Sequence, residues 1–108
     1  MKAKLTGEQG PKKTTATLEI DGRTFELKYS TNAICDAERE AGCSLLTAMI
    51  DFAGMSVIQL RALLCACIRG GDPMSKMTVK EAGDLVKYET IFAITNALAE
   101  AMLLSAAK

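Results

Sequence analysis

The sequence has no histidine and no tryptophan, and its 108 residues include only three phenylalanines and two tyrosines. Without histidine, the chain lacks the side chain that most often serves as a general base and as a metal ligand. We therefore expect no metal site and no cofactor. With so few rings, the core must consist of aliphatic and sulfur-containing side chains, and apolar residues supply 49% of the sequence.

The chain also lacks net charge, because 13 basic side chains balance 13 acidic ones. Dedicated nucleic-acid binders usually carry a basic surplus, so we expect no nucleic-acid partner. The balance is uneven along the chain. Residues 1–13 hold four lysines and one glutamate, whereas residues 14–108 have three more acidic than basic side chains. This pattern predicts a flexible basic tail at 1–13 and a single domain at 14–108.

Long apolar runs are absent as well. The longest, from Ala62 to Ile68, has seven residues, whereas a membrane-spanning helix needs about 20. The charged first residues are not followed by the apolar stretch of a secretory signal. We expect no membrane partner and a cytoplasmic location.

The four cysteines, Cys35, Cys43, Cys65 and Cys67, are not spaced like zinc-binding pairs. Cys65 and Cys67 are two positions apart in a helical segment, so their sulfurs point about 200° apart around the helix. This spacing predicts reduced, buried thiols that pack as small hydrophobic groups. Since no cysteine has an evident base partner, we predict that the protein is not an enzyme.

The clearest local signal lies at residues 14–29, where two alternating runs flank Asp21-Gly22. Asp-Gly favours a two-residue type I′ turn, which predicts a β-hairpin and fixes its register. The predicted pairs on the apolar face are Ile20 with Arg23, Leu18 with Phe25, Ala16 with Leu27 and Thr14 with Tyr29. An isolated hairpin is only marginally stable, so this face must pack on helices or on another subunit.

After the hairpin, the apolar spacing becomes helical. The first helix is expected to begin at Ser30, Thr31 or Asn32, which are good N-terminal caps, and to end at Gly42. Ser44 is expected to cap the second helix.

Two capping boxes then mark further helix starts, and a glycine pair marks an end. Ser56 with Gln59 precedes the third helix, and Thr78 precedes the fourth. The third helix is expected to stop at Gly70-Gly71. The expected helices span about 31–41, 44–53, 56–69, 78–88 and 90–106. The predicted fold class is therefore α+β, mainly α, and it remains open whether 79–107 is one bent helix or two.

Two segments are too apolar for helices with one side in water. The segment from Ala62 to Ile68 is apolar on all sides, which predicts a centrally buried helix. Residues 91–104 carry two apolar stripes, and the first is Ile91, Ile94, Leu98, Ala101 and Met102. The second stripe is Phe92, Ala99 and Leu103. Either this helix is a second core helix with both stripes buried, or the second stripe docks a partner protein.

Methionine is the other notable feature, with six residues in the chain. Its flexible, polarizable side chain suits surfaces that accept varied partners. Met55, Met74 and Met77 flank expected loops, so we predict that they are partly exposed. The candidate partner-binding residues are therefore Phe92, Ala99, Leu103, Met55, Met74 and Met77.

The order of these elements, with IDGRTFELKYSTNAICDAEREAG at 20–42 and TVKEAGDLV at 78–86, resembles the tail assembly chaperones of long-tailed bacteriophages. The resemblance covers roughly residues 14–106 and is greatest to the branch shared with gene transfer agents. It implies a non-enzymatic protein of phage or prophage origin that binds the tape measure protein and helps recruit tail tube subunits. It also implies a location in the bacterial host cytoplasm and absence from the mature virion.

Two other functions remain open at this point. The chain could be a structural tail or connector subunit that stays in the virion, or a small helical interaction module with an unknown partner. The hairpin face and the 91–104 stripes together exceed what one small core covers, so we also expect a homo-oligomer.

Overall fold

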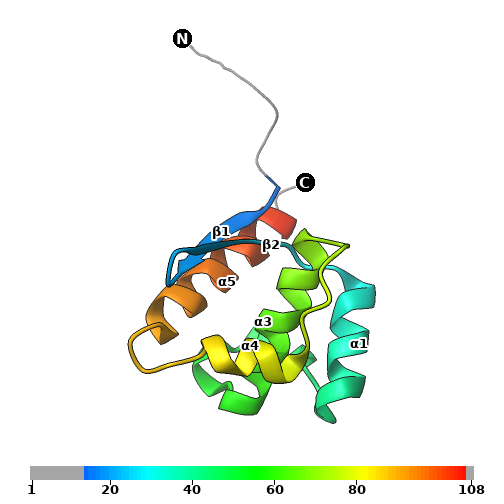
Figure 1. The fold of residues 1–108 in the computed structure, drawn as a ribbon. Coiled ribbons are helices and arrows are strands. Elements are labelled where there is room, and N and C mark those ends of the chain that lie inside the picture. Colours follow the sequence, from blue (N-terminus) through cyan, green and yellow to red (C-terminus); the bar gives the residue numbers. More distant parts are fainter. Residues whose placement is uncertain (1–13, 107–108) are drawn as a thin grey trace.

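The computed structural model describes residues 14–106, in which a β-hairpin lies over a group of helices (Figure 1). The elements are β1 (Ala16–Ile20), β2 (Arg23–Leu27), α1 (Thr31–Ala41), α2 (Leu46–Ile50), the 3-10 helix η1 (Phe52–Gly54), α3 (Val57–Gly71), α4 (Val79–Leu85) and α5 (Ile91–Ala106). The α+β, mainly α, fold class is confirmed. The expected flexible tail at 1–13 lies outside the described residues.

The hairpin turns where the sequence predicts. Asp21 and Gly22 both have positive φ, 52° and 79°, as a type I′ turn requires. The strands pair antiparallel in the predicted register, from the pair Ala16 and Leu27 to the pair Ile20 and Arg23 beside the turn. The expected pairing of Thr14 with Tyr29 is wrong, because the ladder ends at Leu27 and the next N–H, of Lys28, bonds instead to the Cys67 carbonyl of α3 at 3.0 Å.

The central helix is α3, which is buried on all sides from Ala62 to Ile68, as predicted. It packs against α1, α4 and β2. The expected stop at Gly70-Gly71 is wrong, since both glycines belong to α3. A Cβ on Gly71 would overlap the Glu26 carbonyl oxygen of β2, so the glycines serve close packing against the hairpin.

The second helix is shorter than the expected 44–53. α2 begins at Leu46, and Ser44 does not cap it, because the cap position is Leu45 and no side chain bonds to the free N–H groups there. The Leu45 N–H itself donates to the Glu38 carboxylate of α1 at 2.7 Å. At the other end, the Asp51 carboxylate accepts the Gly54 N–H at 3.3 Å. This local bond favours the 3-10 helix η1 over continuation of α2.

The segment after Val79 forms two helices. α4 ends at Leu85 rather than near residue 88. The Thr90 hydroxyl accepts the Lys87 N–H and lies 2.8 Å from the Leu85 carbonyl oxygen, to which it donates. This hydroxyl satisfies backbone groups at the junction, so a break occurs without a glycine.

The cysteines are free thiols with different exposures. Cys65 and Cys67 are buried, and burial raises the pKa of Cys65 to about 11 and raises that of Cys67 further. Both thiols are therefore protonated, weak nucleophiles near neutral pH. The expected burial is wrong for Cys35, which is exposed because it lies about 200° around α1 from the buried Ala37.

Candidate functional site

α5 has one covered side and one open side. Ile94, Leu98 and Ala101 are buried, and the helix packs mainly against β1 (Figure 1). On the opposite side, Phe92 is 76% exposed and Leu103 is 70% exposed. Of the two alternatives for this helix, the one in which both stripes are buried is therefore wrong. The second stripe, with Ala99 half-buried between its two large members, forms an apolar surface.

An apolar groove continues this surface at the start of α5. It has a volume of about 230 Å³ and lies between α5 and the segment that joins η1 to α3. No charged side chain lines it; its lining residues are Phe52, Met55, Ser56, Val57, Leu60, Ile91, Phe92 and Thr95. The fold thus brings Met55 and Phe92, which are 37 positions apart in the sequence, to the same groove. We call this groove and the second stripe together the α5 surface.

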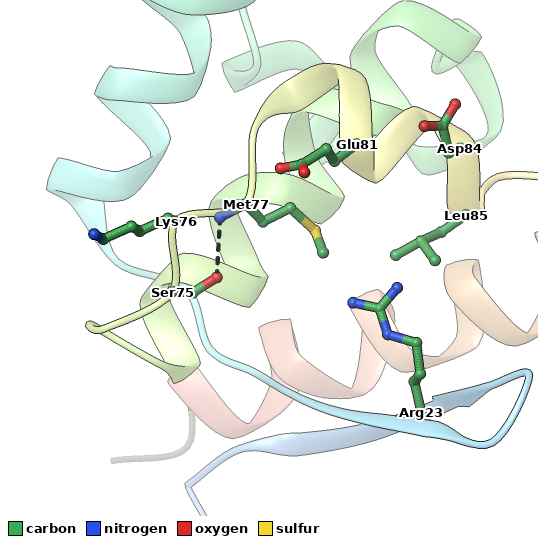
Figure 2. Close-up of a pocket in the computed structure, with 7 residues that line it drawn as sticks. All are labelled: Arg23, Ser75, Lys76, Met77, Glu81, Asp84 and Leu85. Atoms are coloured by element: carbon green, nitrogen blue, oxygen red, sulfur yellow. Dashed lines mark hydrogen bonds between the residues drawn. The ribbon is translucent and has the colours of Figure 1, made fainter.

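Met74 and Met77 do not join the α5 surface. Both lie in the loop between α3 and α4, where Met74 is 84% exposed and Met77 packs partly against the core. Met77 lines a second groove, of about 470 Å³, between β2 and α4 (Figure 2). The other side chains around it are Arg23, Ser75, Lys76, Glu81, Asp84 and Leu85.

This second groove is polar, and several of its groups already have partners. The Glu81 carboxylate accepts the Thr78 N–H at 2.9 Å in a capping box, and the Ser75 hydroxyl accepts the Met77 N–H at 3.2 Å. The Arg23 guanidinium lies 4.9 Å from the centre of the Phe25 ring. Two cations and two carboxylates share the open rim, so the groove has no single-sign field for a charged ligand.

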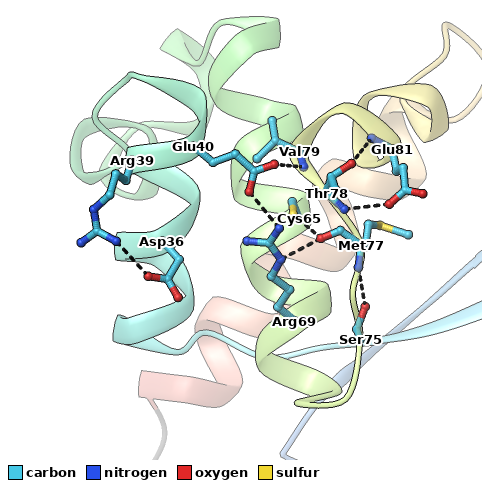
Figure 3. A network of polar contacts seen from close by, with 10 residues as sticks. All are labelled: Asp36, Arg39, Glu40, Cys65, Arg69, Ser75, Met77, Thr78, Val79 and Glu81. Carbon is cyan, nitrogen blue, oxygen red and sulfur yellow. Dashed lines mark hydrogen bonds and ion pairs between the residues drawn. The ribbon is translucent and has the colours of Figure 1, made fainter.

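A polar network fixes the loop that carries these methionines (Figure 3). The Glu40 carboxylate of α1 accepts the Val79 N–H at 2.8 Å and an Arg69 N–H at 2.9 Å. Arg69 also donates through Nε to the Met77 carbonyl at 2.7 Å. The Val79 N–H, followed by Arg69, holds the pKa of Glu40 below its ordinary value of 4.5. The network joins α1, α3 and the start of α4.

Sequence reasoning missed the groove and this network. Val57, which lines the groove, is 63% exposed at the first position of α3. Its position directly after the Ser56 cap is the one feature of the sequence that indicates this exposure. The partners of Glu40 in the network, Arg69 and Val79, are 29 and 39 positions away. Neither contact leaves a local signal in the sequence.

Within residues 14–106, no three His, Cys, Asp or Glu side chains are placed to hold a metal ion together. No helix in the same range combines the length and the hydropathy needed to cross a membrane.

Comparison with known proteins adds no information about the function of these surfaces. No protein-family model, no curated protein and no solved structure matches this chain.

Proposed function

We propose that this protein is a phage or prophage tail assembly chaperone that binds the tape measure protein and helps recruit tail tube subunits. The observation that supports this most is the α5 surface: an open apolar stripe beside an uncharged groove. Exposed apolar patches of this kind on small proteins mark protein-binding sites. The order of sequence elements that resembles the chaperone family supports the same function.

The α5 surface suits a client that presents apolar helical segments. An amphipathic helix in a groove is recognised through large side chains at spacings of three and four residues. Phe92 and Leu103 offer two exposed contacts, and Met55 adds an adaptable wall to the groove. With few charges near it, the surface favours binding through apolar burial, which tolerates varied client sequences.

A holding chaperone must also release its client when the tube is built. The α5 surface is small beside the interfaces of permanent complexes, which bury more than about 2,000 Å². Binding is then weak at each site and strengthened by several copies along one client. A chaperone that leaves its client during assembly stays in the cytoplasm of the bacterial host and is absent from the mature virion.

The test is co-expression with the tape measure protein of the phage or prophage whose genome encodes this chain. We expect the wild type to raise the soluble fraction of that protein and to elute with it in gel filtration. Phe92→Asp and Leu103→Asp should lower both by about tenfold, because each places a charge in the apolar contact. Ile50→Asp is the matched control, since Ile50 is 79% exposed but lines neither groove.

Two results would contradict the proposal. One is a tape measure protein that stays insoluble with the wild type. The other is equal loss of binding in Ile50→Asp and Leu103→Asp, which would show that the α5 surface is not special.

A structural tail or connector subunit is the alternative, because the same open surface would then be covered permanently by a neighbour in the virion. Mass spectrometry of purified particles separates the two. The chaperone is absent from finished particles, whereas a connector subunit is present in a fixed ratio to the tube protein.

A further inference from the structure

The outward side of α5 has a regular spacing. Phe92, Asn96, Ala99 and Leu103 follow one another at intervals of four, three and four positions. On an α-helix, these four positions fall within an arc of about 60°. Asn96 is exposed like Phe92 and Leu103, Ala99 is half-buried, and the buried residues of α5 lie on the opposite side. The spacing is that of a helix-pairing seam.

This seam, formed by Phe92, Asn96, Ala99 and Leu103, is also symmetric about its midpoint. The two large side chains, Phe92 and Leu103, are equally far from a midpoint between Ala97 and Leu98, and the smaller Asn96 and Ala99 lie equally far inside them. Two antiparallel copies related by a two-fold axis at this midpoint would therefore place Phe92 opposite Leu103 and Asn96 opposite Ala99. Such a surface is complementary to itself, as a two-fold dimer requires.

The apolar groove gives the antiparallel arrangement a further contact. The groove lies at the Phe92 end of α5 and is open there. In the antiparallel pair, Leu103 of the second copy reaches this same level of the helix. Its side chain, 70% exposed in one copy, then enters a groove of about 230 Å³ walled by Met55 and Val57. A parallel pair would leave both grooves without a leucine.

We propose that the protein forms a two-fold homodimer in which the α5 helices pack antiparallel and each Leu103 fills the groove of the other copy. The small Ala99 and Asn96 at the centre let the two helices approach closely. The two Asn96 side chains lie about 4.5 Å apart along the helix axis, within reach of each other for an amide hydrogen bond. That bond reduces the cost of covering a polar group.

The area of the contact sets the strength of the dimer. Phe92, Leu103 and the groove wall at Val57 are between 63% and 76% exposed in one copy. Covering them and the small central residues in both copies buries about 1,000 Å² in total, at the lower limit for specific interfaces. The dimer is therefore weak, and it forms and dissociates as the protein concentration changes.

The dimer rests on this geometry alone and does not depend on the proposed function. If that function is right, the dimer has a consequence for it. The same side chains cannot contact a client and a second copy at once, so the dimer protects the α5 surface until a client displaces one copy.

The test uses opposite charges at the two ends of the seam. Sedimentation equilibrium of the wild type should show a monomer–dimer exchange. Phe92→Lys alone and Leu103→Glu alone should each weaken it by about tenfold or more, because each dimer then buries two unpaired charges. Both positions are exposed, so the fold should persist, and circular dichroism checks this. Ile50→Lys and Ile50→Glu are the matched controls and should dimerise like the wild type.

An equimolar mixture of Phe92→Lys and Leu103→Glu distinguishes the antiparallel dimer from the other arrangements. In the antiparallel pair, the introduced lysine faces the introduced glutamate, and the other end keeps its Phe92–Leu103 contact, so the mixture should regain a dimer. A parallel pair or a dimer through another face gives no recovery. A mixture that stays monomeric, a wild type that is monomeric at all concentrations, or single variants that dimerise fully would each overturn the proposal.

Discussion

α3 and α5 are the two most apolar helices of the chain, yet the fold treats them differently. α3 is enclosed by α1, α4 and β2, and no residue from Ala62 to Ile68 reaches the surface. α5 is covered mainly by β1, and its other side leaves Phe92 and Leu103 open. The two helices are alike in composition and differ in the number of neighbours that cover them.

This difference shows how much can be concluded from the apolar content of a helix by itself. A helix without a polar side must have its surface covered, but the neighbours that cover it need not all belong to the same chain. For the part of α3 from Ala62 to Ile68, the chain supplies them all. For α5, it supplies only the hairpin side, and that shortage supports both the proposed client binding and the proposed dimer.

Truncation inside α3 should give the largest effect. Leu64→Ala removes a fully buried side chain and should lower the free energy of unfolding by about 2–5 kcal/mol. Denaturant unfolding followed by circular dichroism measures this loss. A loss below about 1 kcal/mol would mean that α3 is not the packed centre of the fold.

The contact of α3 with β2 should give the next effect. Gly71→Ala forces a Cβ against the Glu26 carbonyl oxygen and should cost about 1–3 kcal/mol as the backbones separate. Gly83→Ala is the matched control, because its Cβ would meet only the flexible Arg61 side chain at 3.1 Å. If thermal unfolding ranks the two glycines equally, the close α3–β2 contact is not what requires Gly71.

The Glu40 network should give a smaller effect that depends on pH. Because the folded pKa of Glu40 lies below its unfolded value, its ionised form stabilises the fold above the unfolded pKa. That contribution is lost as the pH falls through the lowered folded pKa. Glu40→Gln should thus be less stable than the wild type at pH 7, by no more than about 1 kcal/mol for a partly exposed pair.

Unfolding of Glu40→Gln and wild type at a series of pH values measures this difference. The gap between them should close at acid pH, where the wild-type carboxyl is protonated. A gap that stays constant from pH 7 to the acid range would rule out this role for the Glu40 charge.

The open side of α5 should give the smallest effect on stability. Phe92→Ala and Leu103→Ala should each change the free energy of unfolding by no more than about 0.5 kcal/mol, because both side chains lie largely in water. The same denaturant measurement used for Leu64→Ala tests this. A loss above about 2 kcal/mol would place these side chains in the core and remove the contrast between the two helices.

Local signals in the sequence predicted most of the fold. The Asp21-Gly22 turn and the capping boxes at Ser56 and Thr78 are where they were expected, because each depends on residues a few positions apart. The errors came from distant contacts. At the start of α2, the Leu45 N–H bonds to Glu38 of α1, and at the end of α3, Gly71 packs directly against the Glu26 carbonyl of β2.

The candidate site divides in the same way. Helical spacing separates Phe92 and Leu103 from the first stripe of α5, but their exposure was one of two alternatives until the fold was known. The meeting of Met55 with Phe92 depends on how η1 and α3 pack, which no local pattern encodes. Met74 and Met77 were grouped with them by residue type and by their place beside expected loops, and the fold places them elsewhere.

The most direct test of the central claim, that the open side of α5 is a binding surface, is hydroxyl-radical footprinting of this protein alone and mixed with its proposed client, the tape measure protein. At a protein concentration low enough to keep the free chain monomeric, we predict that oxidation of Phe92 and Leu103 falls several-fold in the complex. Oxidation of Ile50, which is equally exposed on α2, should not change. Unchanged oxidation at Phe92 and Leu103, with protection elsewhere, would contradict the account.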